Sequence, residues 1–216
     1  MPHTRSVRWK GILLLLGVIL FAVATIAAEP FEQESPLGLY QAIAENSTQF
    51  QFVNLLAGLG FIVLLIALVA LGRLTPPHER RLAMAGLGLL GLGALLWLIE
   101  VFGRVTTTVA TARQVEAGSV PPTTFPANLG VGLEPLFVAF LVTTLAGLAI
   151  LLWHMGEAGL LSRRWSRVGA GVVVASGGIA ALTYPWVGGI ERALFYPFVL
   201  VLLPLAVSLI VRRHRT

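Results

Sequence analysis

The side chains of this chain that are suited to chemistry are few, and the most suggestive are three glutamates near the ends of apolar stretches. They are Glu100, Glu134 and Glu191, and Arg104 follows the first of them by four residues. On a helix this spacing places two side chains on one face, where an arginine can pair with a carboxylate. These four residues therefore predict an outward-facing polar site for a cation or a polar ligand. The alternative is a set of interfacial charges that reach water or pair locally.

Other catalytic and metal-binding patterns are missing from the sequence. The chain has no cysteine, which excludes disulfides, thiolate zinc sites and iron–sulfur clusters. A bis-histidine haem needs two histidines on helices, and only His154 falls in an apolar stretch. No serine, histidine and acid lie at a compatible predicted depth for a nucleophilic triad. We expect no catalytic residue, no metal site and no cofactor.

One glycine pattern resembles a nucleotide-binding motif but has a different meaning here. The glycines of Gly86-x-Gly88-x-x-Gly91 match the dinucleotide fingerprint. That motif needs a strand before it and a helix after it, and here it lies inside a long apolar stretch. We interpret it as a helix-packing face.

The composition indicates the kind of element that carries these residues. Of 216 residues, 56% are hydrophobic and 12% are charged, whereas a soluble domain has roughly twice that charged fraction. A helix that crosses a bilayer needs about 20 mainly apolar residues, so six helices would use roughly 120. The whole chain is therefore predicted to be a single all-α transmembrane domain, a polytopic helix bundle in contact with lipid.

Apolar runs bounded by charge or proline predict six membrane-spanning helices. The first run could instead belong to a signal peptide, because Arg5, Arg8 and Lys10 precede it and small residues end it. Its length favours a retained helix. The predicted spans are 11–28, 52–72, 82–103, 131–153, 168–187 and 190–211.

Lysine and arginine are distributed unequally between alternate loops. Three of these residues, Arg104, Arg113 and Arg192, lie on one predicted side. The other twelve lie on the opposite side, which the positive-inside rule identifies as cytoplasmic. Both termini are therefore expected in the cytoplasm, and the expected membrane is a prokaryotic plasma membrane. Basic residues dispersed at span ends are orientation signals, so nucleic acid is not an expected partner despite the net charge of +5. The twelve are Arg5, Arg8, Lys10, Arg73, Arg80, Arg81, Arg163, Arg164, Arg167, Arg212, Arg213 and Arg215.

Two predicted outer segments, 29–51 and 104–130, are longer than a hairpin needs. Within the first, 36–49 is predicted to form a short amphipathic helix on the outer surface, and the alternative is a simple lead-in to the second span. Within the second, the helical spacing continues past the third span, and Gly118 is a suitable terminator. The third helix is therefore expected to run from 82 to about 117.

Small residues crowd the third and fifth predicted spans, which makes these two helices the expected packed centre of the bundle. Pro204 should kink the sixth span. An ordinary packing kink and a moving gate are both compatible with a proline there. The central turns of all six spans carry no charge, which disfavours proton-coupled transport.

The stretch Gly159-Leu-Leu-Ser-Arg-Arg-Trp-Ser-Arg-Val-Gly169, followed by a helix rich in glycine and alanine, resembles bacterial six-helix integral membrane families of unknown function. In those families a short basic loop of this kind joins the fourth and fifth helices. The resemblance covers the last four helices. It implies an α-helical bundle and no particular activity.

Three functions are compatible with this pattern. The first is a non-catalytic accessory, assembly or scaffold subunit that holds other membrane subunits through its small-residue faces and outer segments. The alternative is a small-solute or ion transporter or channel with an outward-facing polar pocket. The third is an intramembrane enzyme that acts through Glu100 and Glu134. The absent midplane charge and the absent catalytic clusters favour the first.

Overall fold

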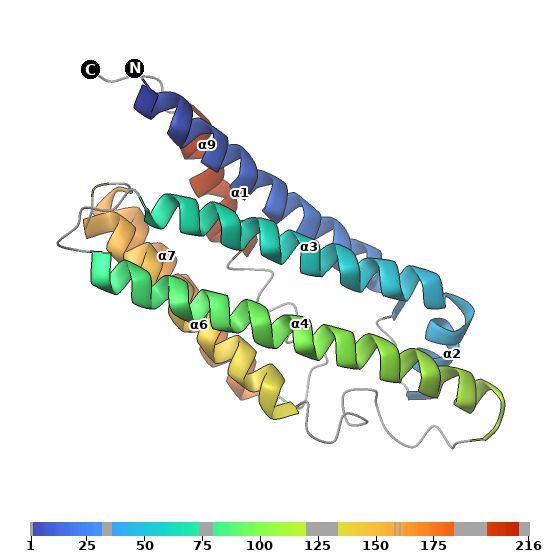
Figure 1. Ribbon diagram of the computed structural model, residues 1–216. Coiled ribbons are helices and arrows are strands. Elements are labelled where there is room, and N and C mark those ends of the chain that lie inside the picture. The colour runs from blue at the N-terminus through green and yellow to red at the C-terminus, as the bar shows by residue number, and fades with distance from the viewer. Residues whose placement is uncertain are drawn as a thin grey trace.

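The structure is a computed structural model, and it describes residues 2–31, 36–73, 80–119, 134–157, 159, 161–183 and 198–211. Throughout this part the chain is helical, without any strand, as the composition predicts (Figure 1). The backbone alone is described at 2–7, 29, 36, 80, 100, 104, 134–137, 178–183, 198 and 199.

Long helices account for most of the described chain, and two short ones accompany them. The third predicted span belongs to a helix that extends to Glu116, close to the expected end at 117. The predicted helix at 36–49 is confirmed over Pro36–Glu45, but residues 47–49 instead begin the next helix, and its place on the outer surface stays a prediction. In order the elements are α1 (Pro2–Ala27), the 3-10 turn η1 (Glu29–Phe31), α2 (Pro36–Glu45), α3 (Ser47–Gly72), α4 (Arg80–Glu116), α6 (Glu134–Glu157), α7 (Arg163–Thr183), the π-helical turn η2 (Phe198–Leu202) and α9 (Leu203–Val211).

Four of the described helices are long and apolar enough to cross a membrane. They contain the segments Arg8–Ala27, Ser47–Gly72, Arg81–Glu116 and Val138–Glu157. The segment Leu200–Val211 is also apolar but shorter. The fifth and sixth predicted spans, 168–187 and 190–211, fall only partly within the described residues. Several long apolar helices make the chain compatible with an integral membrane protein in contact with lipid.

Successive long helices pack antiparallel, and glycines lie where their backbones come closest. A Cβ at Gly60 of α3 would come within 2.9 Å of the Phe21 nitrogen and 3.2 Å of the Gly17 carbonyl oxygen, both on α1. A Cβ at Gly86 of α4 would come within 3.0 Å of the Gly147 carbonyl oxygen on α6. In lipid, close packing of this kind has to replace the hydrophobic drive for helix association.

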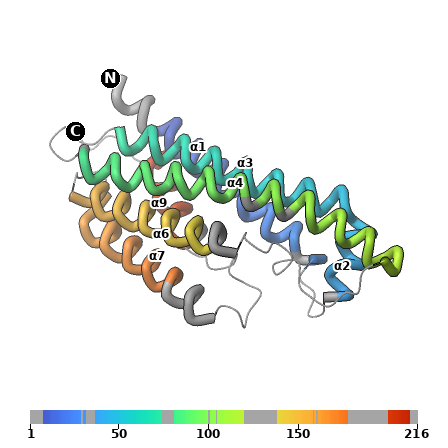
Figure 2. The backbone as a smooth tube through the Cα atoms, turned by 60° about the horizontal axis from the view of Figure 1, so that its bottom comes forward, coloured from blue at the N-terminus to red at the C-terminus, as the bar shows by residue number. Residues whose placement is uncertain are grey.

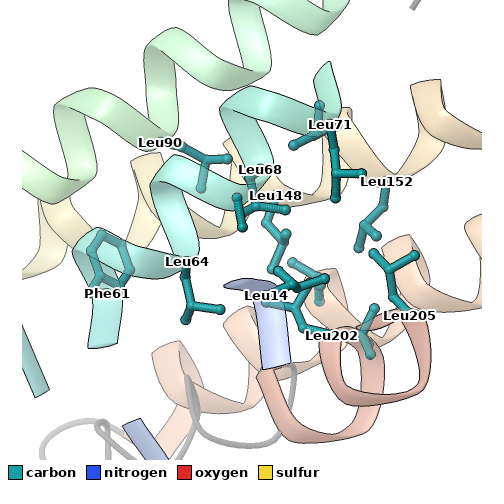
Figure 3. Packing of buried hydrophobic residues seen from close by; sticks show 14 of the residues in the cluster. Leu14, Phe61, Leu64, Leu68, Leu71, Leu90, Leu148, Leu152, Leu202 and Leu205 are labelled. Carbon is teal, nitrogen blue, oxygen red and sulfur yellow. The ribbon is translucent and has the colours of Figure 1, made fainter. Parts of the chain in front are cut away.

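The last helix returns to the first. A Cβ at Gly11 of α1 would lie 2.9 Å from Leu209 Cβ and 3.0 Å from the Ala206 carbonyl oxygen. Helix α9 runs beside α1 in the opposite direction (Figure 1). Leucines from several helices fill the interior that this arrangement encloses, and Leu14 of α1 lies among residues of α3, α6 and α9 (Figure 3). The core therefore joins segments from both ends of the chain.

The expected packed centre is only half correct. Gly86 and Gly93 of α4 do face α6, but a Cβ at Gly88 or Gly91 would meet nothing within 4 Å. Helix α7 packs against α6, on the side of α6 away from α4 (Figure 2). The expectation that α7 is central is wrong for its described side chains, because within 163–177 only one face, which includes Ala170 and Val173, is buried.

The irregularity predicted at Pro204 lies at the start of α9. The π-helical turn η2 ends at Leu202, and Pro204 is the second residue of α9. Proline has no N–H to donate to the preceding turn, so regular α-helical bonding cannot continue through it. Residues 190–197 lie outside the described part.

Candidate functional site

Two helices that carry predicted site residues, α4 and α6, pack side by side. The Trp97 ring of α4 lies 4.8 Å from the Phe140 ring of α6, at an interplanar angle of 33°. Because α4 and α6 run antiparallel, the residues that follow Trp97 are level with those that precede Phe140. Glu100 and Arg104 of α4 are thus at the same end of the helix pair as Glu134, the first residue of α6.

The side chains of this predicted pocket are not among the described ones. Glu100, Arg104 and Glu134 have a described backbone only, and Glu191 lies outside the described residues. Their convergence and the pairing of Glu100 with Arg104 stay predictions. Among the described residues, no group of three or more histidines or acidic residues is placed to hold a metal ion.

An aromatic and hydroxyl cluster joins α3, α4 and α6 deep in the bundle. Phe61 meets Phe140 edge to face at 5.8 Å, and Phe140 in turn packs on Trp97. Thr144 is fully buried against Gly93, where a Cβ would collide with its hydroxyl. The absence of a side chain at Gly93 therefore leaves the space that the Thr144 hydroxyl occupies.

Two polar atoms of this cluster have no conventional hydrogen bond. Thr144 Oγ1 and Trp97 Nε1 are both buried without a partner among the described residues. Neither group carries a charge near neutral pH, and the indole N–H can only donate a hydrogen bond. The sequence offered one unused signal for this cluster, namely Gly93 one helical turn before Trp97.

A second hydrophobic cluster lies at the far end of α4, and we call it the α2–α4 platform. Tyr40 and Ile43 of α2 are each 1% exposed and lie against the last turns of α4 (Figure 1). Burial raises the pKa of the Tyr40 phenol. The buried members of the platform are Phe31, Tyr40, Ile43, Phe50, Val109, Ala112 and Val115.

The platform ends in a defined helix stop. Gly118 has φ +68°, its N–H donates to the Val115 carbonyl (3.0 Å), and the Ser119 N–H donates to the Gln114 carbonyl (2.9 Å). This pair of bonds is a Schellman motif, which glycine favours because it has no Cβ. The predicted role of Gly118 as the helix terminator is confirmed.

The hairpin between α6 and α7 carries a polar network at the opposite end of the bundle. Glu157 lies 3.3 Å from Arg163 Nε and 3.7 Å from Arg167 Nη2. The Arg167 guanidinium lies 5.5 Å from the centre of the Trp153 ring. Ser166 Oγ donates to the Leu152 carbonyl at 2.6 Å. The sequence predicted a basic connection here but gave no sign of the serine bond.

Helix direction gathers the basic residues at this same end. Antiparallel packing places the starts of α1, α4 and α7 beside the ends of α3 and α6. The basic residues at these helix ends are Arg5, Arg8, Lys10, Arg73, Arg80, Arg81, Arg163, Arg164 and Arg167.

No protein-family model, no curated protein and no solved structure matches the chain.

Proposed function

We propose that this chain is an integral membrane protein of six spans, with both termini cytoplasmic, that acts as a non-catalytic accessory, assembly or scaffold subunit. The observation that carries the proposal is the α2–α4 platform. α4 has 37 residues, which at 1.5 Å each is about 55 Å, against a hydrocarbon thickness of about 30 Å. The excess is a rigid projection at the end of the bundle opposite the cluster of basic residues at the starts of α1, α4 and α7.

Bracing by α2 supports a binding role for this projection. An unsupported helix end of this length would fray in water, because isolated short helices are marginal there. Here Tyr40 and Ile43 cover one face of α4. Arg113, Gln114 and Glu116 remain exposed elsewhere on the same helix end. A stiff polar helix face outside lipid is a suitable surface for another subunit.

Threonine hydroxyls along the projecting part of α4 bond back to carbonyls of their own helix. Thr106 Oγ1 donates to the Phe102 carbonyl at 2.8 Å, and Thr111 Oγ1 donates to the Thr107 carbonyl at 2.9 Å. These bonds lie within the helix itself, so the partner-facing surface is formed without the partner. The leucine-filled interior of the described bundle supports a scaffold over a conduit (Figure 3).

The gathering of basic residues at the other end supports the proposed orientation. The positive-inside rule places such a cluster in the cytoplasm. The platform would then project on the outer side. The resemblance to six-helix bacterial membrane families concerns the fold alone, and it stays a proposal.

The proposal is tested by isolating the tagged full chain from its native membrane in mild detergent. We expect a stoichiometric partner with the unaltered chain. The double variant Arg113→Glu/Gln114→Ala should lose this partner, because it changes the exposed face of the platform and no buried residue. The matched control Arg73→Glu makes the same change of charge at an exposed residue of the other end and should keep it. A chain that purifies alone and gives solute flux in liposomes would support the transport alternative instead.

A further inference from the structure

The exposed face of α7 begins with three arginines. Arg163 and Arg167 have side chains that are 69% and 60% exposed, and Arg164 is exposed as well. Glu157 is the carboxylate that faces them, and it contacts two of the three. Positive charge therefore exceeds negative charge across the described hairpin.

The same helix face continues as an apolar strip. At 3.6 residues per turn, Gly171 and Val174 follow Arg167 along the helix. Val168 and Val174 are 54% and 65% exposed. A Cβ at Gly171 would meet nothing within 4 Å, so the middle of the strip has no side chain and faces open space. We call Arg163, Arg164, Arg167, Val168, Gly171 and Val174 the α7 strip.

Tryptophans flank the arginine end of the strip. Trp153 on α6 and Trp165 on α7 are 50% and 54% exposed, and the Arg167 guanidinium lies over the Trp153 ring. Tryptophan is enriched at the level of lipid headgroups, where its apolar ring contacts hydrocarbon and its N–H contacts water. The boundary between cationic and apolar residues on α7 is thus at the depth expected for phosphate groups.

We propose that the α7 strip binds an anionic phospholipid, with its phosphodiester at Arg163, Arg164 and Arg167 and an acyl chain along Val168, Gly171 and Val174. The inference rests on the proposed membrane location. Continuity of the cationic and apolar parts on one helix face favours a lipid over a free phosphate, which would need the arginines alone. A phosphodiester accepts the parallel N–H bonds that arginine donates.

The test measures lipid binding by the detergent-solubilised full chain in native mass spectrometry, with dioleoylphosphatidylglycerol and dioleoylphosphatidylcholine in competition. We expect the unaltered chain to retain phosphatidylglycerol preferentially. Arg163→Gln/Arg164→Gln/Arg167→Gln should lower this preference about tenfold, since each basic residue near an anionic lipid contributes to the attraction. The matched control Arg8→Gln/Arg73→Gln/Arg81→Gln removes the same charge from the same end and should change it less than about twofold.

Two further arms separate a lipid from an anion. Gly171→Leu fills the open position and should weaken retention of both lipids, while sn-glycerol 1-phosphate should compete poorly. Equal losses in the two triple variants would overturn the proposal, and so would full displacement by glycerol phosphate. If the triple variant does not fold, Arg164→Glu provides the same comparison, because Arg164 makes no ion pair among the described residues. Extraction of the chain from membranes by alkaline carbonate would instead contradict the membrane location itself.

Discussion

The hydroxyl of Ser166 donates a 2.6 Å hydrogen bond to the backbone carbonyl of Leu152, which links the first turn of α7 to the last turns of α6. The same hydroxyl lies 3.2 Å from the Trp153 carbonyl. Ser166 is 1% exposed and packs directly on Gly156. One buried serine therefore joins the two helices of the basic hairpin.

Ser166→Ala should destabilise the hairpin by about 1 kcal/mol, the usual net value of a buried hydrogen bond. The expected result is a lower melting temperature in detergent, measured by circular dichroism. Ser176→Ala is the matched control, because Ser176 Oγ bonds the Val172 carbonyl of its own helix and such bonds add little. An equal effect of the two substitutions would contradict a special role for Ser166.

Gly93→Ala should weaken the packing of α4 on α6 by about 1–3 kcal/mol, because the new methyl group collides with the Thr144 hydroxyl. Gly88→Ala, on the open side of the same helix, should be neutral or stabilising by up to about 1 kcal/mol, since alanine favours helix. Thermal unfolding of both variants measures the difference. Combining Gly93→Ala with Thr144→Ala should recover part of the loss, and purely additive effects would argue against the contact.

Alkaline pH should loosen the platform through Tyr40. Burial raises the pKa of Tyr40 above its ordinary value of 10.0, so the folded state holds the phenolic proton more tightly than the unfolded state. Stability linked to this group is thus intact below pH 10 and is lost as the pH rises through the folded pKa. The protection factors of the α2 amides, which correct for base-catalysed intrinsic exchange, should fall in that range. In Tyr40→Phe this fall should disappear, and its persistence would assign the effect to another group.

The proposed orientation predicts opposite labelling of two single cysteines. The natural chain has no cysteine, so Gln114→Cys on the platform and Ser162→Cys at the hairpin are each unique, and both leave every basic residue in place. In intact cells a membrane-impermeant maleimide should label position 114, and it should label position 162 only after permeabilisation. Labelling of both in intact cells would falsify the topology.

The sequence by itself predicted a helical chain with several helices long and apolar enough to cross a membrane. A long apolar run satisfies its own backbone hydrogen bonds when it forms a helix. Lipid would offer those backbone groups no other partner. The long α4, its stop at Gly118 and the helix α2 followed equally from local rules, because caps and turns depend on neighbouring residues. The expected outer group of Glu100, Arg104 and Glu134 was placed on α4 and α6 in the same way.

The tertiary structure decided which helix faces meet. Gly86 and Gly88 differ by two positions, yet one touches α6 and the other faces open space, because successive helical residues point about 100° apart. All helix faces in lipid can be apolar, so hydropathy does not distinguish a buried face from an exposed one. That is why the position of α7 at the side of the bundle, the Ser166 bond to Leu152 and the burial of Thr144 against Gly93 followed only from the packed arrangement.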